Sequence, residues 1–427
     1  VDKERPTYLI FLTDGLPTEG ETDSERILAN FQSNAPENLR LFVFGVGWDV
    51  DTYLLDSLSQ HHRGLSFYVQ PGEDLTERLS EFYTRISTPV LTGLELDFGT
   101  LDVYDLYPQP LPDLFSGTQV VLVGRYRNGG ETDIVLHGDV NGVRQTFRYM
   151  RQSFDTDSRG AQQQTVFLPR LWATRKIGYL LNRIRLNGPD QETIDQIVRL
   201  SIRYGIVTPY TSYLVTEPMP LGVESQQRLA AQSYQELQAG AAAPVFGQDA
   251  VEKAMRQGAL SQAEVAPMIP VQENQRQAVR VIGARTFVYS QDIWTDTAFD
   301  PDRMETQKVA FLSVDYFALA NARRDIAAAL AQAERVIVVV DGAAYQIVAE
   351  NEHTGTVTLP EPQQHPASQL PIQPPAAISG AVDEQPEAQT SGRQQPAGPL
   401  TCLGGLLPLA LILLVLHRCI RCHDSAD

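Results

Sequence analysis

Cysteine is scarce in this sequence of 427 residues. The three cysteines, Cys402, Cys419 and Cys422, all lie in or beside an apolar segment near the C-terminal end, and residues 1–401 contain none. No disulfide can therefore stabilise that part of the chain, and cysteine usage does not fix the redox compartment.

Basic residues are also in short supply. The chain has 34 Lys and Arg against 52 Asp and Glu, so its formal net charge is −18. Nucleic-acid binding needs a basic face, and this excess of acidic residues argues against it. An acidic protein suits divalent cations, although total charge identifies no particular site.

Signatures of catalysis are missing as well. The sequence has no HExxH, GxSxG or P-loop motif, and its seven histidines are scattered apart from the pair His61-His62. We therefore predict that the chain is not an enzyme.

What the sequence does have is a short apolar run that ends abruptly. Tyr8–Leu12 is followed by Thr13, Asp14 and Gly15 within YLIFLTDGLPTEG. Such a run, bounded by turn residues, predicts a strand buried on both faces of a parallel sheet, where ligands bind beyond the carboxyl ends of the strands. Asp14 lies at that end, and its carboxylate is a hard oxygen ligand suited to Mg²⁺ or Ca²⁺. The alternative is that Asp14 only caps the following turn.

Residues 1–88 alternate between strand-like and helix-like segments. Strands are expected at Tyr8–Leu12, Leu39–Gly47 and Gly64–Gln70, and helices after Thr22, after Asp49 or Asp51, and over Glu73–Ser87. This order predicts a doubly wound, parallel α/β sheet with right-handed crossovers. Three strands are few for such a domain, so we expect its first half to precede Val1.

The LTDG ending of the first strand, followed by FVFGVG and a capped helix, resembles the second half of a von Willebrand factor A domain. In that family a metal-ion-dependent adhesion site is formed by a DxSxS motif, a threonine on another loop and an aspartate in a TDG-like position. The resemblance implies that Asp14 is a metal ligand and that Thr13 supports it from outside the coordination sphere. The other two segments would precede Val1, so only a fragment of the site is expected on this chain.

Residues 89–217 change to short alternating segments. Leu91–Phe98 and Gln119–Tyr126 are two of them, and together they predict an antiparallel β-sandwich-like module. Asp139–Gly142 (DVNG) predicts a hairpin turn rather than a calcium loop, because the later acidic ligands are missing. A helical pair is expected next, over Leu168–Leu186 and Gln191–Tyr204.

The most specific signature is the segment Leu168–Val215. Its stretches LPRLWATRKIGYLL and SIRYGIVTPYTSYLV resemble bacterial proteins that pair a vault/inter-alpha-trypsin (VIT) domain with a von Willebrand A domain and are similar to inter-alpha-trypsin inhibitor heavy chains. The resemblance runs from about residue 6 to 216 and more weakly to 349, with the VIT domain expected upstream. The first helix carries several basic residues, predicted to form its solvated face, with a polyanion site as the alternative: Arg170, Arg175, Lys176, Arg183 and Arg185.

Composition divides the remainder of the chain. We expect an Ala/Gln-rich connector over 218–270, a small α+β region over 271–350, a disordered Pro/Gln-rich stalk over 351–399, a transmembrane helix over 400–417 and a short cytoplasmic tail over 418–427. The uncharged run Leu400–Leu416 is close to the length that spans a bilayer core, and basic residues follow it at once, which favours an extracytoplasmic body. The CxxCH pattern from Cys419 to His423 is predicted to be plain juxtamembrane sequence rather than a haem site.

Together these features predict a single-pass cell-membrane protein with an extracytoplasmic body that serves in adhesion or protein interaction. The resemblance implies that binding depends on a divalent cation and that the partner is an extracellular protein or matrix ligand presenting a carboxylate. Two alternatives stay open: a metal-dependent hydrolase that uses Asp14 with Asp49 or Asp51, and a passive surface spacer.

Overall fold

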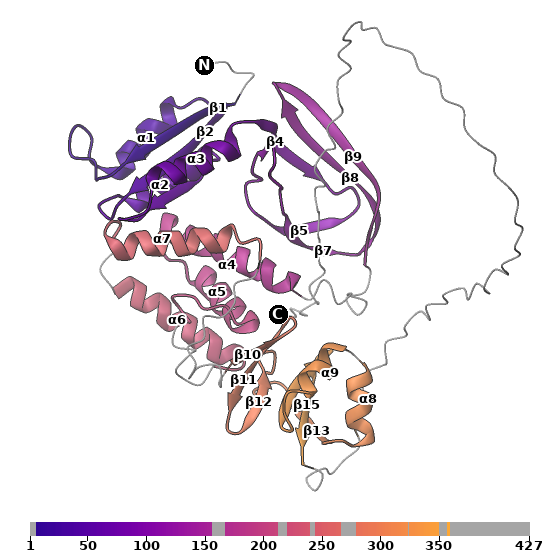
Figure 1. Ribbon diagram of the computed structural model, residues 1–427. Helices are drawn as coiled ribbons and strands as arrows, with labels where there is room; N and C mark the ends of the chain where they lie inside the picture. Colours follow the sequence, from indigo (N-terminus) through magenta and orange to yellow (C-terminus); the bar gives the residue numbers. More distant parts are fainter. Residues whose placement is uncertain are drawn as a thin grey trace, which may run out of the picture. The chain divides into compact units, whose positions relative to one another are not determined.

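The first three strands form a parallel sheet (Figure 1). The computed structural model describes residues 6–155, 167–211, 220–239, 244–265, 279–322, 324–349 and 357–358. Within it the chain begins with β1 (Thr7–Thr13), α1 (Ser24–Asn34), β2 (Leu39–Val46), α2 (Thr52–His61), β3 (Ser66–Val69) and α3 (Leu75–Ile86). The strand order is β1-β2-β3, and both pairings are parallel.

Helices cover both faces of this sheet because the side chains of β2 alternate between two cores. Leu41 and Val43 pack in a core with residues of α1 and α2. Phe42 and Phe44 point to the opposite face and pack with Phe82 of α3. This confirms the predicted doubly wound arrangement for these three strands.

The prediction that the first strand is buried on both faces is wrong. From Leu9 to Leu12 its side chains are 37–43% exposed. The reason is that, among the described residues, β1 lies at the edge of the sheet and has β2 as its single neighbour. The central strand β2, buried from Leu39 to Gly45, has the burial that the sequence pattern predicted for β1.

An antiparallel region follows. Its strands are β4 (Pro89–Asp97), β5 (Asp102–Tyr107), β6 (Leu114–Phe115), β7 (Val123–Arg127), β8 (Gly130–Val140) and β9 (Val143–Phe154). They form a four-stranded sheet in the order β6-β4-β8-β9 and a two-stranded ribbon, β5-β7. The predicted hairpin at DVNG is confirmed, since Val140 pairs with Val143 and both Asn141 and Gly142 have positive φ.

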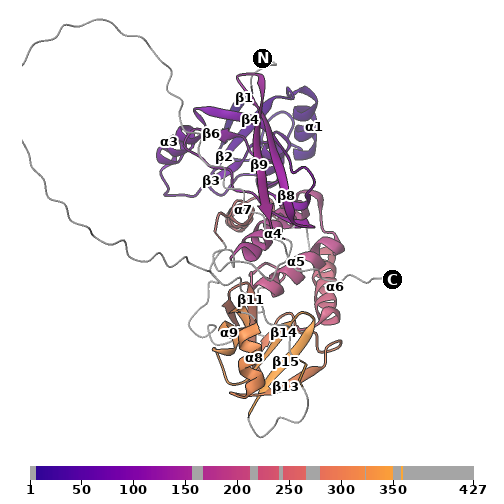
Figure 2. The ribbon, with the colours of Figure 1, turned by 90° about the vertical axis from the view of Figure 1, so that its right-hand side faces the viewer.

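Four helices come next, in two packed pairs: α4 (Leu168–Asn187), α5 (Gln191–Tyr204), α6 (Val223–Ala239) and α7 (Gln248–Ser261). Helix α6 packs on α5, and α7 packs along α4 (Figure 2). The crossing of α4 and α7 is close because Gly178 has no side chain, so the backbone of Ser261 can lie against it. The segment 218–270, expected from its composition to be a connector, therefore contains two packed helices.

The basic residues of α4 do not form a solvated face, which corrects the sequence prediction. Arg175 is only 4% exposed, and its Nε donates to the carbonyl of Ala263 at 2.7 Å. Burial lowers the pKa of this guanidinium. Arg170 donates to the carbonyl of Tyr204 at 3.1 Å, and Arg183 is exposed as expected. Segments distant in sequence cover the sides of α4 that carry the other arginines.

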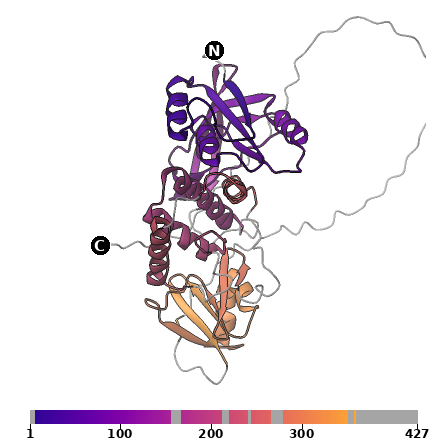
Figure 3. The ribbon, with the colours of Figure 1, turned by 90° about the vertical axis from the view of Figure 1, so that its left-hand side faces the viewer.

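The region after residue 278 is a mixed sheet with two helices. Its elements are β10 (Val279–Ile282), β11 (Arg285–Ser290), β12 (Ile293–Asp296), β13 (Thr306–Ala310), α8 (Val314–Ala322), α9 (Arg324–Leu330), β14 (Val336–Val340) and β15 (Ala343–Val348). The strand order is β10-β11-β12-β14-β15-β13. Figure 2 shows α8 and α9 on one face of this sheet, and Figure 3 shows the other face. A hairpin turn at Asp341 and Gly342 joins β14 to β15, since Val340 pairs with Ala343.

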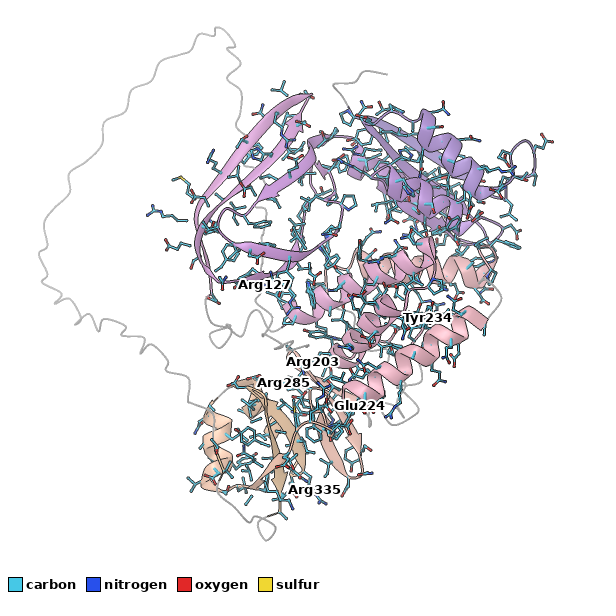
Figure 4. The ribbon with its side chains drawn as sticks, turned by 180° about the vertical axis from the view of Figure 1, so that it is seen from behind. Arg127, Arg203, Glu224, Tyr234, Arg285 and Arg335 are labelled. Carbon is cyan, nitrogen blue, oxygen red and sulfur yellow. The ribbon has the colours of Figure 1, made fainter. Side chains whose placement is uncertain are left out.

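A buried ion pair joins this sheet to α5. Asp296 is fully buried, and its carboxylate lies 2.6 Å from Nη1 of Arg285 and 3.8 Å from Nη1 of Arg203. Figure 4 shows the two arginines side by side where α5 meets the sheet. A buried carboxylate is stable only when it is paired in this way.

The remaining predictions fall outside the described residues. These are the stalk, apart from residues 357 and 358, the transmembrane run Leu400–Leu416 and the cysteine-containing tail. In the part of the chain that the structure describes, no helix is both long enough and apolar enough to cross a membrane.

Candidate functional site

Asp14 lies at the carboxyl end of β1, where the sequence pattern placed it. Its side chain is exposed, and no hydrogen bond to its carboxylate occurs among the described residues. The hydroxyl of the preceding residue, Thr13, donates to the carbonyl of Gly15 at 3.0 Å. Both carboxylate oxygens of Asp14 are therefore available to a ligand.

Asp51 has a different role at the end of the neighbouring strand. Its Oδ1 accepts the backbone N–H of Leu54 at 2.9 Å, which caps α2. Its Oδ2 accepts the hydroxyl of Ser24, the first residue of α1, at 2.5 Å. Because both oxygens are engaged, Asp51 fastens the starts of two helices together. Asp49, which the sequence left as the other capping candidate, is exposed.

The residues at this edge do not form a complete metal site. Among the described residues, no group of three His, Cys, Asp or Glu side chains is placed to hold a metal ion. Asp14 contributes one free carboxylate, whereas the carboxylate of Asp51 is occupied. A cation bound here would need further oxygen ligands from outside the described residues.

Buried carboxylates that sequence analysis did not single out fasten the sheet to its surroundings. The carboxylate of Asp56 on α2 pairs with Arg185 near the end of α4, and it accepts the hydroxyl of Tyr68 at 2.8 Å. Burial and the nearby Asp56 carboxylate raise the pKa of Tyr68 well above its ordinary value. Asp56 lies between Leu55 and Leu58. A single charged residue within an apolar helical run is the sequence feature that could have indicated this buried ion pair.

Arg40 is likewise a single charged residue, here within the apolar strand β2. Its Nε lies 2.8 Å from the carboxylate of Asp113, and both side chains are at least 93% buried. Asp113 also accepts the backbone N–H of Gly93 on β4 at 2.9 Å. This buried pair joins the parallel sheet to the antiparallel region. Replacing either residue alone would leave the other as a buried charge without a partner.

The fold and the site thus define a mixed α/β protein of several sheets, with a free carboxylate at the carboxyl edge of a parallel sheet. The chain is homologous to inter-alpha-trypsin inhibitor heavy chains over about half its length, which confirms the resemblance found in its sequence. It is 31% identical over 224 residues to heavy chain H4 from Homo sapiens, covering 50% of this chain and 24% of that protein. It is 30% identical over 227 residues to heavy chain H3 from Rattus norvegicus, covering 51% and 25%. The chain therefore spans about a quarter of the length of these relatives.

Comparison with family models gives no match. Among solved structures, a von Willebrand factor type A protein from Catenulispora acidiphila is similar with 13% identity and a TM-score of 0.29, covering 61% of this chain and 65% of that one. The ArnB paralog VWA2 from Sulfolobus acidocaldarius is similar with 16% identity and a TM-score of 0.28, covering 54% and 63%. Because these scores are low, the fold assignment rests on the strand order and the two packed faces described above.

Proposed function

We propose that this chain carries part of an adhesion or protein-interaction module that acts outside the cytoplasm and depends on a divalent cation. The observation that carries the proposal is the exposed carboxylate of Asp14 at the carboxyl end of a parallel strand, unpartnered among the described residues. The similarity to proteins named as heavy chains of an inhibitor supports binding rather than catalysis.

In this proposal Asp14 supplies one oxygen ligand to Mg²⁺ or Ca²⁺. Other ligands come from outside the described residues, and an Asp or Glu carboxylate of the partner completes the shell. Hard divalent cations take six or more oxygen ligands, so an open position for a partner's carboxylate suits their chemistry. The partner is an extracellular protein or matrix ligand that presents such a group.

Membrane attachment belongs to the same proposal. The run Leu400–Leu416 is uncharged, and Arg418 and Arg421 follow it. An apolar run flanked by basic residues supports a single-pass anchor with the tail in the cytoplasm. Release of the protein from membranes by alkaline carbonate would contradict this part of the proposal.

The test compares Asp14→Ala with Asp49→Ala in the intact protein. Both aspartates are exposed and follow neighbouring strands of the same sheet, so the pair separates a specific site from a general loss of negative charge. We expect Mg²⁺ or Ca²⁺ to support binding to immobilised extracellular-matrix proteins, and we expect Asp14→Ala or EDTA to abolish it. Asp49→Ala should bind as the unsubstituted protein does.

Binding that survives both EDTA and Asp14→Ala would overturn the cation-dependent proposal. Turnover of ester, peptide or phosphate substrates that is lost in Asp14→Ala would instead favour the hydrolase. No observation in the described residues supports that alternative at present, because both oxygens of Asp51 are engaged and Asp49 has no partner in a site.

A further inference from the structure

The β5–β7 ribbon presents a face of charged and aromatic residues. Tyr104 lies opposite Arg125 across the ribbon. Asp102 lies opposite Arg127. Since side chains alternate along a strand, these four residues share one face, while Val103 packs into a core on the other. The face is half-buried at Tyr104 and Arg125 and exposed at Arg127, which lies at the end of β7 (Figure 4).

A bulge in β5 fastens this face to α4. Asp105 has a φ of 49°, in the left-handed region, where the pairing of β5 with β7 shifts register. As a result its backbone carbonyl accepts the indole N–H of Trp172 at 3.0 Å. Its carboxylate accepts from Nζ of Lys176 at 2.7 Å. A residue outside its preferred backbone conformation therefore holds two side chains of α4 against the ribbon.

The result is an alternating ladder of cations and aromatic rings. Cζ of Arg125 lies 5.2 Å from the ring centre of Tyr104 and 5.1 Å from that of Trp172. Cζ of Arg127 lies 4.5 Å from the Tyr104 ring, and Nζ of Lys176 lies 5.3 Å from the Trp172 ring. We refer to these five side chains as the cation–π ladder.

The three cations of the ladder differ in their partners. Arg127 is 2.7 Å from the carboxylate of Asp102, and Lys176 is 2.7 Å from that of Asp105. Arg125, the central cation, has no carboxylate within ion-pair distance in the described part of the chain, and its buried Nε has no hydrogen-bond acceptor there. Among the described residues, the guanidinium at the centre of the ladder therefore has two aromatic neighbours and no ionic partner.

We propose that the cation–π ladder recognises a carboxylate of an acidic peptide, with Arg125 as the binding side chain. Both aromatic rings lie against the guanidinium, and its Nε is buried, whereas its two Nη groups are not among the fully buried atoms. The Nη edge is therefore the part of the guanidinium that a ligand can reach. That edge presents parallel N–H donors, whose geometry matches the two oxygens of a carboxylate. The rings fix the guanidinium before a ligand arrives, so little side-chain freedom is lost on binding.

One further observation favours a peptide over an acidic sugar. In the described structure β5 and β7 form a sheet of two strands only. Carbonyl groups of β5 already accept from Trp172 and Arg175 of α4, so β7 is the strand whose outer edge can pair with an extended peptide. The net charge of −18 repels acidic peptides and acidic sugars alike, so either ligand would need a local cationic site such as Arg125. The interaction needs no metal and is independent of the function proposed for Asp14.

The experiment titrates the full chain with fluorescent hexaglutamate in EDTA and follows anisotropy, and it also records the Nε–H signals of arginines by NMR. We expect binding that Arg125→Gln weakens at least tenfold. The affinity of Arg125→Lys for hexaglutamate should lie between those of the unsubstituted chain and Arg125→Gln, because a lysine keeps the charge and loses the planar edge. In the unsubstituted chain, hexaglutamate should shift the Nε–H signal of Arg125, a measurement that needs no variant.

The matched control is Arg280→Gln, since Arg280 lies 4.2 Å over the ring of Trp294 in the C-terminal sheet. We expect it to bind hexaglutamate as the unsubstituted chain does. If the chemical shift of the Arg125 Nε–H did not change at saturating hexaglutamate, the proposal would be overturned and the ladder would have a structural role alone. Binding of tetragalacturonate without binding of hexaglutamate would also overturn it, in favour of an acidic sugar.

Discussion

At the scale of single residues, Tyr8 shows how a strand that looks ordinary in sequence acquires an unusual environment. Its ring packs near Phe42 and Phe115, with ring centres 6.1 and 6.0 Å away. Its hydroxyl is buried and has no hydrogen-bond partner among the described residues. Burial, and then the nearby carboxylate of Asp113, raise the pKa of Tyr8 to about 12.

Replacing Tyr8 by phenylalanine is expected to stabilise the chain. Tyr8→Phe removes a buried hydroxyl that has no partner, and we expect a gain of up to about 1 kcal/mol in the free energy of unfolding at pH 7. The folded-state pKa lies above the unfolded value of about 10. The unsubstituted chain therefore keeps its full free energy of unfolding below pH 10, where Tyr8 is neutral in both states. It loses part of that free energy as the pH rises toward 12, because the tyrosine ionises more readily in the unfolded chain.

Urea denaturation at pH 7 and between pH 10 and 12 measures both effects. Tyr8→Phe should lose less stability than the unsubstituted chain over the alkaline range. The control is Tyr83→Phe, because Tyr83 is 65% exposed and its replacement should change neither value. A Tyr8→Phe chain that is less stable at pH 7 would show that the hydroxyl has a partner.

At the scale of elements, the helix pair α4 and α5 was the part best predicted. The bounds Gln191–Tyr204 match α5, and Leu168–Leu186 misses α4 by one residue. Apolar spacing and a capping Asp190 are local signals, so one sequence suffices to find them. The surroundings of Arg170 and Arg175 could not be predicted, since distant segments cover them.

The crossing of α4 and α7 depends on a single glycine. A Cβ on Gly178 would lie 2.3 Å from the backbone nitrogen of Ser261, and backbone atoms can yield only if the helix moves. We expect Gly178→Ala to destabilise the chain by about 1–3 kcal/mol, the usual cost of overpacking. Urea denaturation followed by circular dichroism measures the change.

Gly258 of α7 provides the matched control. A Cβ there would meet no atom within 4 Å. Gly258→Ala should therefore stabilise the chain by roughly 0.5–1 kcal/mol, because alanine loses less backbone entropy in a helix. If both substitutions stabilised the chain equally, close packing at Gly178 would be ruled out as the constraint on this crossing.

At the scale of the whole molecule, the sequence predicted the βα order of the first sheet and the position of Asp14 at a strand end. It did not predict that β1 is exposed. In β1 the four residues from Leu9 to Leu12 form an apolar run like that of β2. The length of such a run cannot distinguish an edge strand from a central strand. The same limit applies to the site, since a carboxylate can be placed by local pattern but its fellow ligands are set by distant segments.

The exposed edge predicts that a protein made of these 427 residues alone self-associates. An apolar edge strand with unpaired backbone groups is a template for pairing with another strand. The net charge of −18 opposes this by repulsion between copies, but salt shortens the range of that repulsion, from about 30 Å at 0.01 M to about 3 Å at 1 M ionic strength. We therefore expect the average mass from light scattering to rise with salt concentration.

A lysine on the edge should reverse this behaviour. Ile10→Lys places a charge at the middle of β1, where pairing of a second strand would bury it, so the salt-dependent rise in mass should be suppressed. Val314→Lys is the control, because Val314 is 85% exposed on α8 and has the same change in charge at a site without a strand edge. Equal suppression by both substitutions would assign the association to total charge or to another apolar segment. Suppression by Ile10→Lys alone would identify β1 as the strand that pairs with a second copy of the chain.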